Sequence, residues 1–176
     1  MRAATILALA LLVAACSQPP GNVLEVGRAG FRVTVPPGWD ARGTDRGEWA
    51  DGRTVALFAN QPLDPQCRTS GSAQSCSAPL ATLGEGALLV WWLSENCAGI
   101  RCEPPDGERL LVGGRPATRI GGSHLCASLG ATSERAYLVT VSPQRLDAIV
   151  VCERNASEAT QAELRDMLEH VSWRTP

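Results

Sequence analysis

The segment from Gly86 to Leu93, GALLVWWL, has no polar side chain and constrains the fold more than any other stretch of this chain. An apolar run of this length, bounded by a glycine and by polar residues, is typical of a strand that is covered on both faces. Because side chains alternate along a strand, Trp91 and Trp92 are expected to point to opposite faces. One ring is expected in the core, and either Trp91 or Trp92 is a candidate aromatic anchor for a partner.

Shorter strands are expected before and after this segment. The Asp51-Gly52 pair suits the positive φ angles of a type I′ turn and predicts a hairpin between residues 48–50 and 53–59. The Gly113-Gly114 pair predicts a second hairpin in the same way. Alternating apolar residues predict further strands at 23–26, 31–35, 109–112, 115–120, 135–141 and 147–152.

One helix is expected near the end of the sequence, and Asn155 or Ser157 can cap its first turn. Apolar residues repeat there at the spacing of one helix face, and they are Leu164, Met167, Leu168 and Val171. The sequence therefore predicts a single α+β domain over residues 29–176. We expect a twisted, mostly antiparallel sheet with the C-terminal helix packed on one face and with disulfide-stapled loops.

Residues 1–16, MRAATILALALLVAAC, resemble the signal of a bacterial lipoprotein. Arg2 precedes an uncharged apolar run that is too short to cross a bilayer as a helix. An aliphatic residue, two small residues and Cys16 then end the segment, as in the lipobox of that class. The resemblance implies that residues 1–15 are a signal peptide, removed before Cys16, and that Cys16 receives acyl chains such as palmitate. Residues 16–28 then form a lipidated, flexible tether.

This interpretation places the protein in the cell envelope, anchored by lipid. The expected site is the outer membrane of a bacterium with two membranes, or otherwise the outer face of the plasma membrane. The alternatives are a plain secretory signal with an incidental cysteine, or a cytosolic protein with an apolar first segment.

The six cysteines after Cys16 form an even set, which favours disulfides in an oxidising compartment. Their spacing lacks the paired C-x2-C knuckles of a zinc site and the C-x-x-C of a redox centre, so no metal is expected. The sequence alone does not fix the connectivity. The simplest assignment pairs neighbours: Cys67 with Cys76, Cys97 with Cys102, and Cys126 with Cys152.

All 16 basic residues are arginine, and the net charge is -2. The absence of lysine excludes Schiff-base enzymes, Ser-Lys dyads and P-loop nucleotide sites. A mildly acidic chain without a basic run gives no sign of a nucleic acid partner. No cofactor is expected.

The order of several short motifs resembles that of the PsbP-like superfamily, including the LpqN-type bacterial lipoproteins. The matching segments are FRVTVPPGW at 31–39, GGRPATRI at 113–120, AYLVTV at 136–141, LDAIVV at 146–151 and ELRDMLEHVSW at 163–173. The resemblance implies an α/β/α or α+β sandwich without a catalytic centre, in proteins that bind, scaffold or assist assembly. The cysteine-bearing loops depart from the family pattern.

No catalytic residue is assigned from the sequence. His170 is expected at the end of the helix, where the macrodipole favours a cation. His124 lies near Ser123, Ser128 and Cys126, but no G-x-S-x-G motif accompanies these residues.

The predicted function is that of a non-enzymatic envelope lipoprotein that binds or scaffolds a protein or small ligand through the loops at 60–82 and 94–108. Its expected partners are the membrane, through the lipid anchor, and an envelope protein or small ligand. The alternative is an envelope hydrolase that uses His124 with nearby serine or acidic residues.

Overall fold

The computed structural model describes residues 22–44, 48–71, 73–97, 102–122 and 124–174. Within these ranges the chain forms three β-sheets, one α-helix and one short 3-10 turn. The predicted signal peptide and Cys16 lie outside the described residues.

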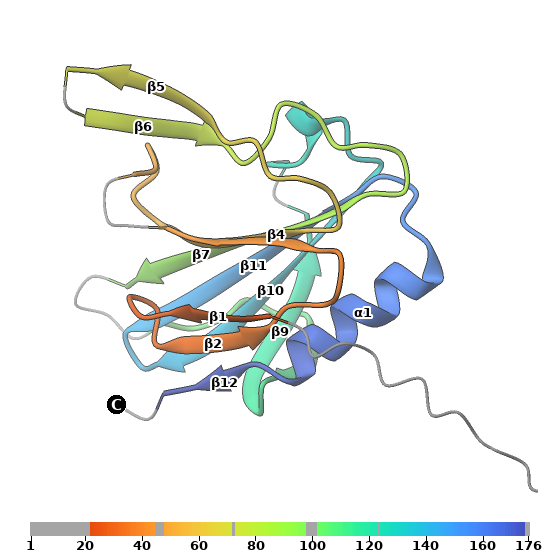
Figure 1. The fold of residues 1–176 in the computed structure, drawn as a ribbon. Coiled ribbons are helices and arrows are strands. Elements are labelled where there is room, and N and C mark those ends of the chain that lie inside the picture. The colour runs from red at the N-terminus through yellow and green to blue at the C-terminus, as the bar shows by residue number, and fades with distance from the viewer. Residues whose placement is uncertain (1–21, 45–47, 72, 98–101, 123, 175–176) are drawn as a thin grey trace, which may run out of the picture.

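A seven-stranded antiparallel sheet forms the centre of the molecule, in the order β3-β4-β7-β11-β10-β9-β8 (Figure 1). Strand β7 lies between β4 and β11, and its residues from Leu88 to Leu93 are all buried. This burial confirms the prediction of a strand that is covered on both faces. The strands are β3 (Asp40–Gly43), β4 (Thr54–Ala59), β7 (Leu88–Asn96), β8 (Glu108–Val112), β9 (Arg115–Gly121), β10 (Ser133–Ser142) and β11 (Arg145–Glu153).

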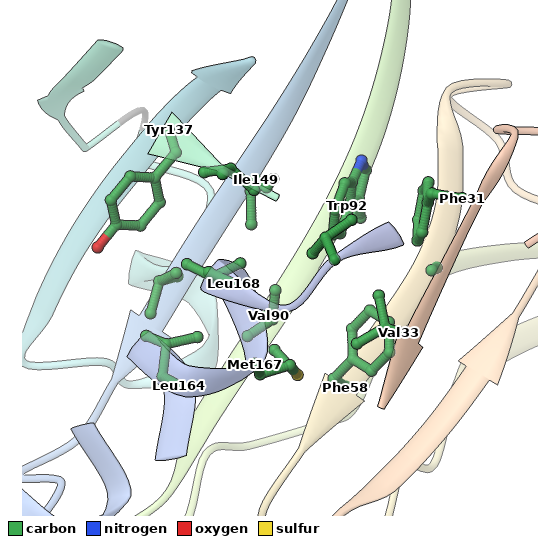
Figure 2. Packing of buried hydrophobic residues seen from close by; sticks show 14 of the residues in the cluster. Phe31, Val33, Phe58, Val90, Trp92, Tyr137, Ile149, Leu164, Met167 and Leu168 are labelled. Carbon is green, nitrogen blue, oxygen red and sulfur yellow. The ribbon is translucent and has the colours of Figure 1, made fainter. Parts of the chain in front are cut away.

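One face of this sheet, the helix face, is covered by a second sheet and by helix α1 (Glu158–Glu169) (Figure 1). The second sheet consists of β1 (Val23–Val26), β2 (Phe31–Thr34) and β12 (Ser172–Trp173). Trp92 of β7 stacks on Phe31 of β2, with ring centroids 4.0 Å apart (Figure 2). The helix adds Leu164, Met167 and Leu168 to the same cluster (Figure 2). Each fully buried side chain of this kind contributes roughly 1.5–3 kcal/mol, so apolar packing holds this face.

The opposite face, the loop face, is covered mainly by connecting segments. Its buried cluster contains Trp91 of β7 together with Trp49, Leu80 and Leu83 from the segments that cross it. The predicted loop at 60–82 contains a hairpin of β5 (Gln66–Ser70) and β6 (Ala73–Ala78), which projects from the molecule (Figure 1). The 3-10 turn η1 (Ala127–Leu129) adds Leu129.

Three disulfides are present, so the prediction of disulfide-bonded cysteines is confirmed. They join neighbours in the sequence: Cys67 with Cys76, Cys97 with Cys102, and Cys126 with Cys152. The first links the two strands of the β5–β6 hairpin, and the third fastens the segment before η1 to β11. Both of these lie on the loop face.

The predicted α+β class is wrong. The part of the chain that the structure describes is mostly β, with 50% of its residues in strands, 10% helical and a single α-helix. The α+β prediction assigns one face of the sheet to the helix alone, but residues 23–34 and 172–173 form a sheet of their own that shares this face. Alternation at Phe31 and Val33 specifies which side chains are buried, but it does not specify which sheet the strand joins.

The predicted hairpin at Asp51-Gly52 does not form either. Strand β4 pairs with β3, from Asp40 opposite Ala59 to Gly43 opposite Ala56. The dipeptide still makes a turn, with Gly52 at a φ of 63°, but the turn leads into β4 from a loop. The turn at Asp51-Gly52 is therefore confirmed, whereas the pairing of β4 depends on residues farther away in the chain.

Two other local predictions are confirmed. Gly113 and Gly114 both have positive φ angles and join β8 to β9 in a hairpin. Ser157 caps α1, because its side chain accepts a hydrogen bond from the Thr160 N–H at 3.1 Å.

Candidate functional site: an arginine-lined cavity

A polar cavity of about 480 Å³ lies at one end of the seven-stranded sheet, where the register places Arg145 of β11 opposite Asn96 of β7. Three arginines from three separate segments line it: Arg28, Arg53 and Arg145. The other lining residues are Gly52, Val55, Ser94, Glu95 and Asn96. We call this space the arginine cavity.

A fully buried carboxylate holds Arg145 at the wall of the arginine cavity. Both carboxylate oxygens of Asp147 accept hydrogen bonds from Arg145, at 2.9 Å from Nε and 2.9 Å from Nη2. Asp147 also accepts a hydrogen bond from the Trp92 indole N–H at 3.0 Å, and its exposure is 0%. Burying a charge is costly unless it is paired and hydrogen-bonded, and here Trp92 and Arg145 meet both conditions.

The second tryptophan supports another wall of the cavity. The Trp91 indole N–H donates to the Thr54 hydroxyl oxygen at 2.8 Å. The Thr54 hydroxyl also hydrogen-bonds to the Asp51 carboxylate. The same carboxylate accepts hydrogen bonds from the backbone N–H groups of Arg53, at 2.8 Å, and of Thr54, at 3.0 Å. Trp91 and Asp51 therefore fix the turn that carries Gly52 and Arg53 into the cavity.

The turn between β1 and β2 supplies the third wall. Arg28 Nη2 donates a hydrogen bond to the Gly52 carbonyl at 2.9 Å. Arg145 Nη2 donates a hydrogen bond to the Ala29 carbonyl at 3.0 Å. This turn thus contacts both other walls. The second sheet, which the sequence argument did not foresee, positions one of the three arginines.

The lining is positive although the chain as a whole has a net charge of -2. Three arginines face one acid, Glu95, which pairs with Arg53 at 2.6 Å. Among the described residues, no carboxylate pairs with Arg28 and no partner meets Arg145 Nη1. Guanidinium groups bind carboxylates and phosphates through paired hydrogen bonds, so this arrangement can hold an anion.

The two predicted anchor residues occupy a different place from the one expected. Trp91 and Trp92 point to opposite faces, as the strand pattern predicts, but both are buried, with exposures of 7% and 0%. Neither ring is presented to a partner. Each acts instead through its indole N–H, which supports one wall of the arginine cavity.

The residues of the hydrolase alternative are not gathered at this cavity. His124 is exposed and has a φ of 66°. Ser128 is also exposed, and its hydroxyl oxygen lies 3.5 Å from the Leu125 carbonyl. Ser123 lies outside the described residues.

One predicted loop contributes to the cavity and the other does not. Ser94, Glu95 and Asn96, from the start of the segment at 94–108, end strand β7 and line the space. Close by, the backbone N–H groups of Cys97 and Cys102 donate to the carbonyls of residues 144 and 143, at 2.9 and 2.8 Å. The disulfide between these cysteines thus lies against the turn that leads into Arg145.

Sequence reasoning missed all three arginines. Arg145 and Asp147 did leave a signal, because they occupy two successive inward positions of a strand whose next inward residue, Ile149, is apolar. A charged pair in such positions indicates a buried network. Arg28 and Arg53 gave no comparable signal, since each lies in a turn.

Among the described residues, no helix is long and apolar enough to cross a membrane. The same residues contain no group of three or more His, Cys, Asp or Glu side chains that could hold a metal ion.

No protein-family model matches the chain. The chain is similar to insulin-like growth factor-binding protein 3 of Sus scrofa, with 30% identity over 171 residues. The match covers 96% of this chain and 49% of the relative, so the chain spans about half the length of the curated relative it matches.

Proposed function

We propose that this protein is a non-enzymatic, lipid-anchored protein of the bacterial cell envelope that binds a small anion in the arginine cavity. The ligand carries carboxylate or phosphate oxygens. The observation that carries the proposal is the buried support of Arg145 by Asp147 and Trp92. The desolvation cost of a buried ion pair offsets the attraction between its charges, so such a pair adds little net stability. Stability therefore does not account for the Arg145–Asp147 pair, whereas its position at a cavity wall supports a binding role.

The proposed ligand follows from the donors that remain. Arg28 and Nη1 of Arg145 offer N–H groups without a carboxylate partner in the described part of the chain, and Arg53 pairs with a half-exposed Glu95. An anion can bind the first two groups directly and compete with Glu95 for the third. A cavity of about 480 Å³ has room for a molecule with two or three such anionic groups.

The proposed anchor rests on the sequence of residues 13–16 and on the cysteine count. The chain has seven cysteines, and six of them pair with one another. Cys16 is therefore left for acylation. The similarity to a relative whose name describes it as a binding protein, and the resemblance to the PsbP-like superfamily, both agree with a binding role.

Titration calorimetry with citrate and inorganic phosphate tests the binding proposal. We expect at least one of these probes to bind the wild-type protein, with an affinity that falls as the salt concentration rises. Arg28→Gln should weaken that binding by about tenfold, because it removes one charge-assisted hydrogen bond worth about 1.5 kcal/mol. Arg28 is exposed, so this change should leave the fold intact.

Arg68→Gln is the matched control. Arg68 is an exposed arginine on β5, outside the arginine cavity, and its substitution changes the net charge by the same amount. We expect its affinity to equal that of the wild type. The proposal is wrong if neither probe binds, or if the two variants lose affinity equally.

A further inference from the structure

Strand β8 is one of the two edge strands of the seven-stranded sheet; it pairs with β9 on one side and ends the strand order on the other. Near its C-terminal end, helix α1 closes the edge, because the Gly113 N–H donates to the Leu168 carbonyl at 2.9 Å. The open part therefore runs from Glu108 to Leu111. Leu111, at the end of this open part, is 61% exposed.

The hairpin geometry shows which backbone groups face outward. A two-residue turn with positive φ at both positions makes Val112 and Arg115 a hydrogen-bonded pair. Hydrogen-bonded and non-hydrogen-bonded pairs alternate along an antiparallel ladder, so Leu111 and Pro116 form a non-hydrogen-bonded pair. Proline has no N–H to donate, which agrees with this assignment. Arg109 and Leu111 therefore direct their backbone N–H and C=O groups away from β9.

Two cavities flank this edge, one on each face of the sheet. The first has a volume of about 390 Å³, and its lining includes Leu111, Pro116, Pro104 and Pro105. The second has a volume of about 540 Å³ and is mainly apolar. Its lining includes Leu110, Tyr137 and Leu168.

Charged groups in both cavities are balanced. The first contains one acid and one base, Asp106 and Arg109. The second contains two of each: Glu108 and Glu169, with Arg119 and Arg165. The electrostatic complement of such linings is a segment without net charge.

We propose that the β8 edge binds an extended, uncharged peptide segment of another protein, which adds to the sheet as an eighth strand. Outward backbone groups on alternate residues fit only a partner backbone in the extended conformation. Side chains of an added strand alternate between the faces, so its apolar residues would enter the two cavities in turn. Self-pairing of two β8 strands about Leu110 would instead place Arg109 beside the apolar Leu111 of the second copy, twice in each dimer.

Selection of blocked nine-residue peptides displayed on phage tests this proposal. Peptides are selected on the folded protein, and those that also bind the Leu111→Pro variant are removed. Proline at position 111 deletes an outward N–H but no ladder hydrogen bond to β9, so the hairpin should persist. We expect uncharged peptides with apolar residues at successive positions, and an affinity for the wild type at least about fivefold higher than for the variant.

N-methylation of each backbone amide of a selected peptide gives a readout that leaves the protein unchanged. Methylation at alternate positions should abolish binding, while methylation between them should have little effect, because only every second amide faces β8. A uniform effect along the peptide would overturn the proposal, as would failure to enrich any peptide. A wild-type dimer that Leu111→Pro dissociates would also overturn it, in favour of a second copy as the occupant.

Discussion

On the helix face, α1 and the sheet β1-β2-β12 bury a continuous cluster around Phe31 and Trp92 that contains no cysteine. On the loop face, connecting segments and the β5–β6 hairpin cover the middle strands of the same sheet, and the cluster includes three buried cysteines together with the partly buried Cys67. A helix or a second sheet presents many apolar side chains to the sheet that it covers, so packing alone can hold it in place. An irregular segment buries fewer apolar side chains. A disulfide then helps, because it lowers the conformational entropy of the unfolded chain and so reduces the entropy lost on folding.

The two faces meet at the arginine cavity. Trp92 supports Arg145 from the helix face through Asp147, and Trp91 supports the turn that carries Arg53 through Thr54. The cavity wall thus depends on the buried Arg145–Asp147 ion pair on one side, and on a hydrogen-bond chain from Trp91 through Thr54 to the Asp51 carboxylate on the other. The changes below test the comparison of the helix face with the crosslinked loops, in order of decreasing expected effect.

Removing the buried carboxylate should have the largest effect. Asp147→Ala leaves Arg145 without its counter-ion and the buried Trp92 indole N–H without an acceptor. We expect the free energy of unfolding to fall by about 3–5 kcal/mol, the usual cost of breaking one side of a buried ion pair. Urea denaturation measures this change.

The control for this variant is Glu25→Ala. Glu25 pairs with Arg174, and both side chains are 58% exposed. An exposed pair of this kind contributes less than about 1 kcal/mol. Equal losses for Asp147→Ala and Glu25→Ala would contradict the account of the helix face.

Removing a loop-face crosslink should have a slightly smaller effect. The double variant Cys126→Ala/Cys152→Ala opens a bridge with a sequence separation of 26. Chain entropy predicts a loss of about 3.5 kcal/mol in the free energy of unfolding. Opening the bridge between Cys97 and Cys102, with a separation of 5, should cost about 2 kcal/mol. Thermal or urea unfolding of the two double variants provides the comparison, and a larger loss for the shorter bridge would contradict it.

The sequence predicted features that depend on neighbouring residues. The buried strand at 86–93, the Gly113-Gly114 hairpin and the cap at Ser157 all follow from a few adjacent side chains. It did not predict the pairing of β2 with β12, whose residues lie far apart in the chain. The expected α+β class is wrong because half of the described residues lie in strands and only one tenth are helical.

The candidate site escaped sequence reasoning for the same reason. Arg28, Arg53 and Arg145 come from different turns and strand ends, and only the assembled sheets bring them together. No local pattern specifies such a meeting point. Trp91 and Trp92 are predicted as aromatic anchors for a partner, whereas in the structure both rings are buried and support the cavity through their indole N–H groups.

The most direct test compares how Trp92→Phe and Trp49→Phe bind the probe, citrate or inorganic phosphate, that the wild-type protein binds. Both changes replace a buried indole with a phenyl ring. The Trp92 N–H bonds to Asp147, whereas the Trp49 N–H has no partner among the described residues. Calorimetry on the folded variants should show binding about fivefold weaker for Trp92→Phe, because Arg145 loses part of its support, and unchanged binding for Trp49→Phe. Equal affinities of the two variants would contradict the claim that the buried tryptophan network builds the anion site.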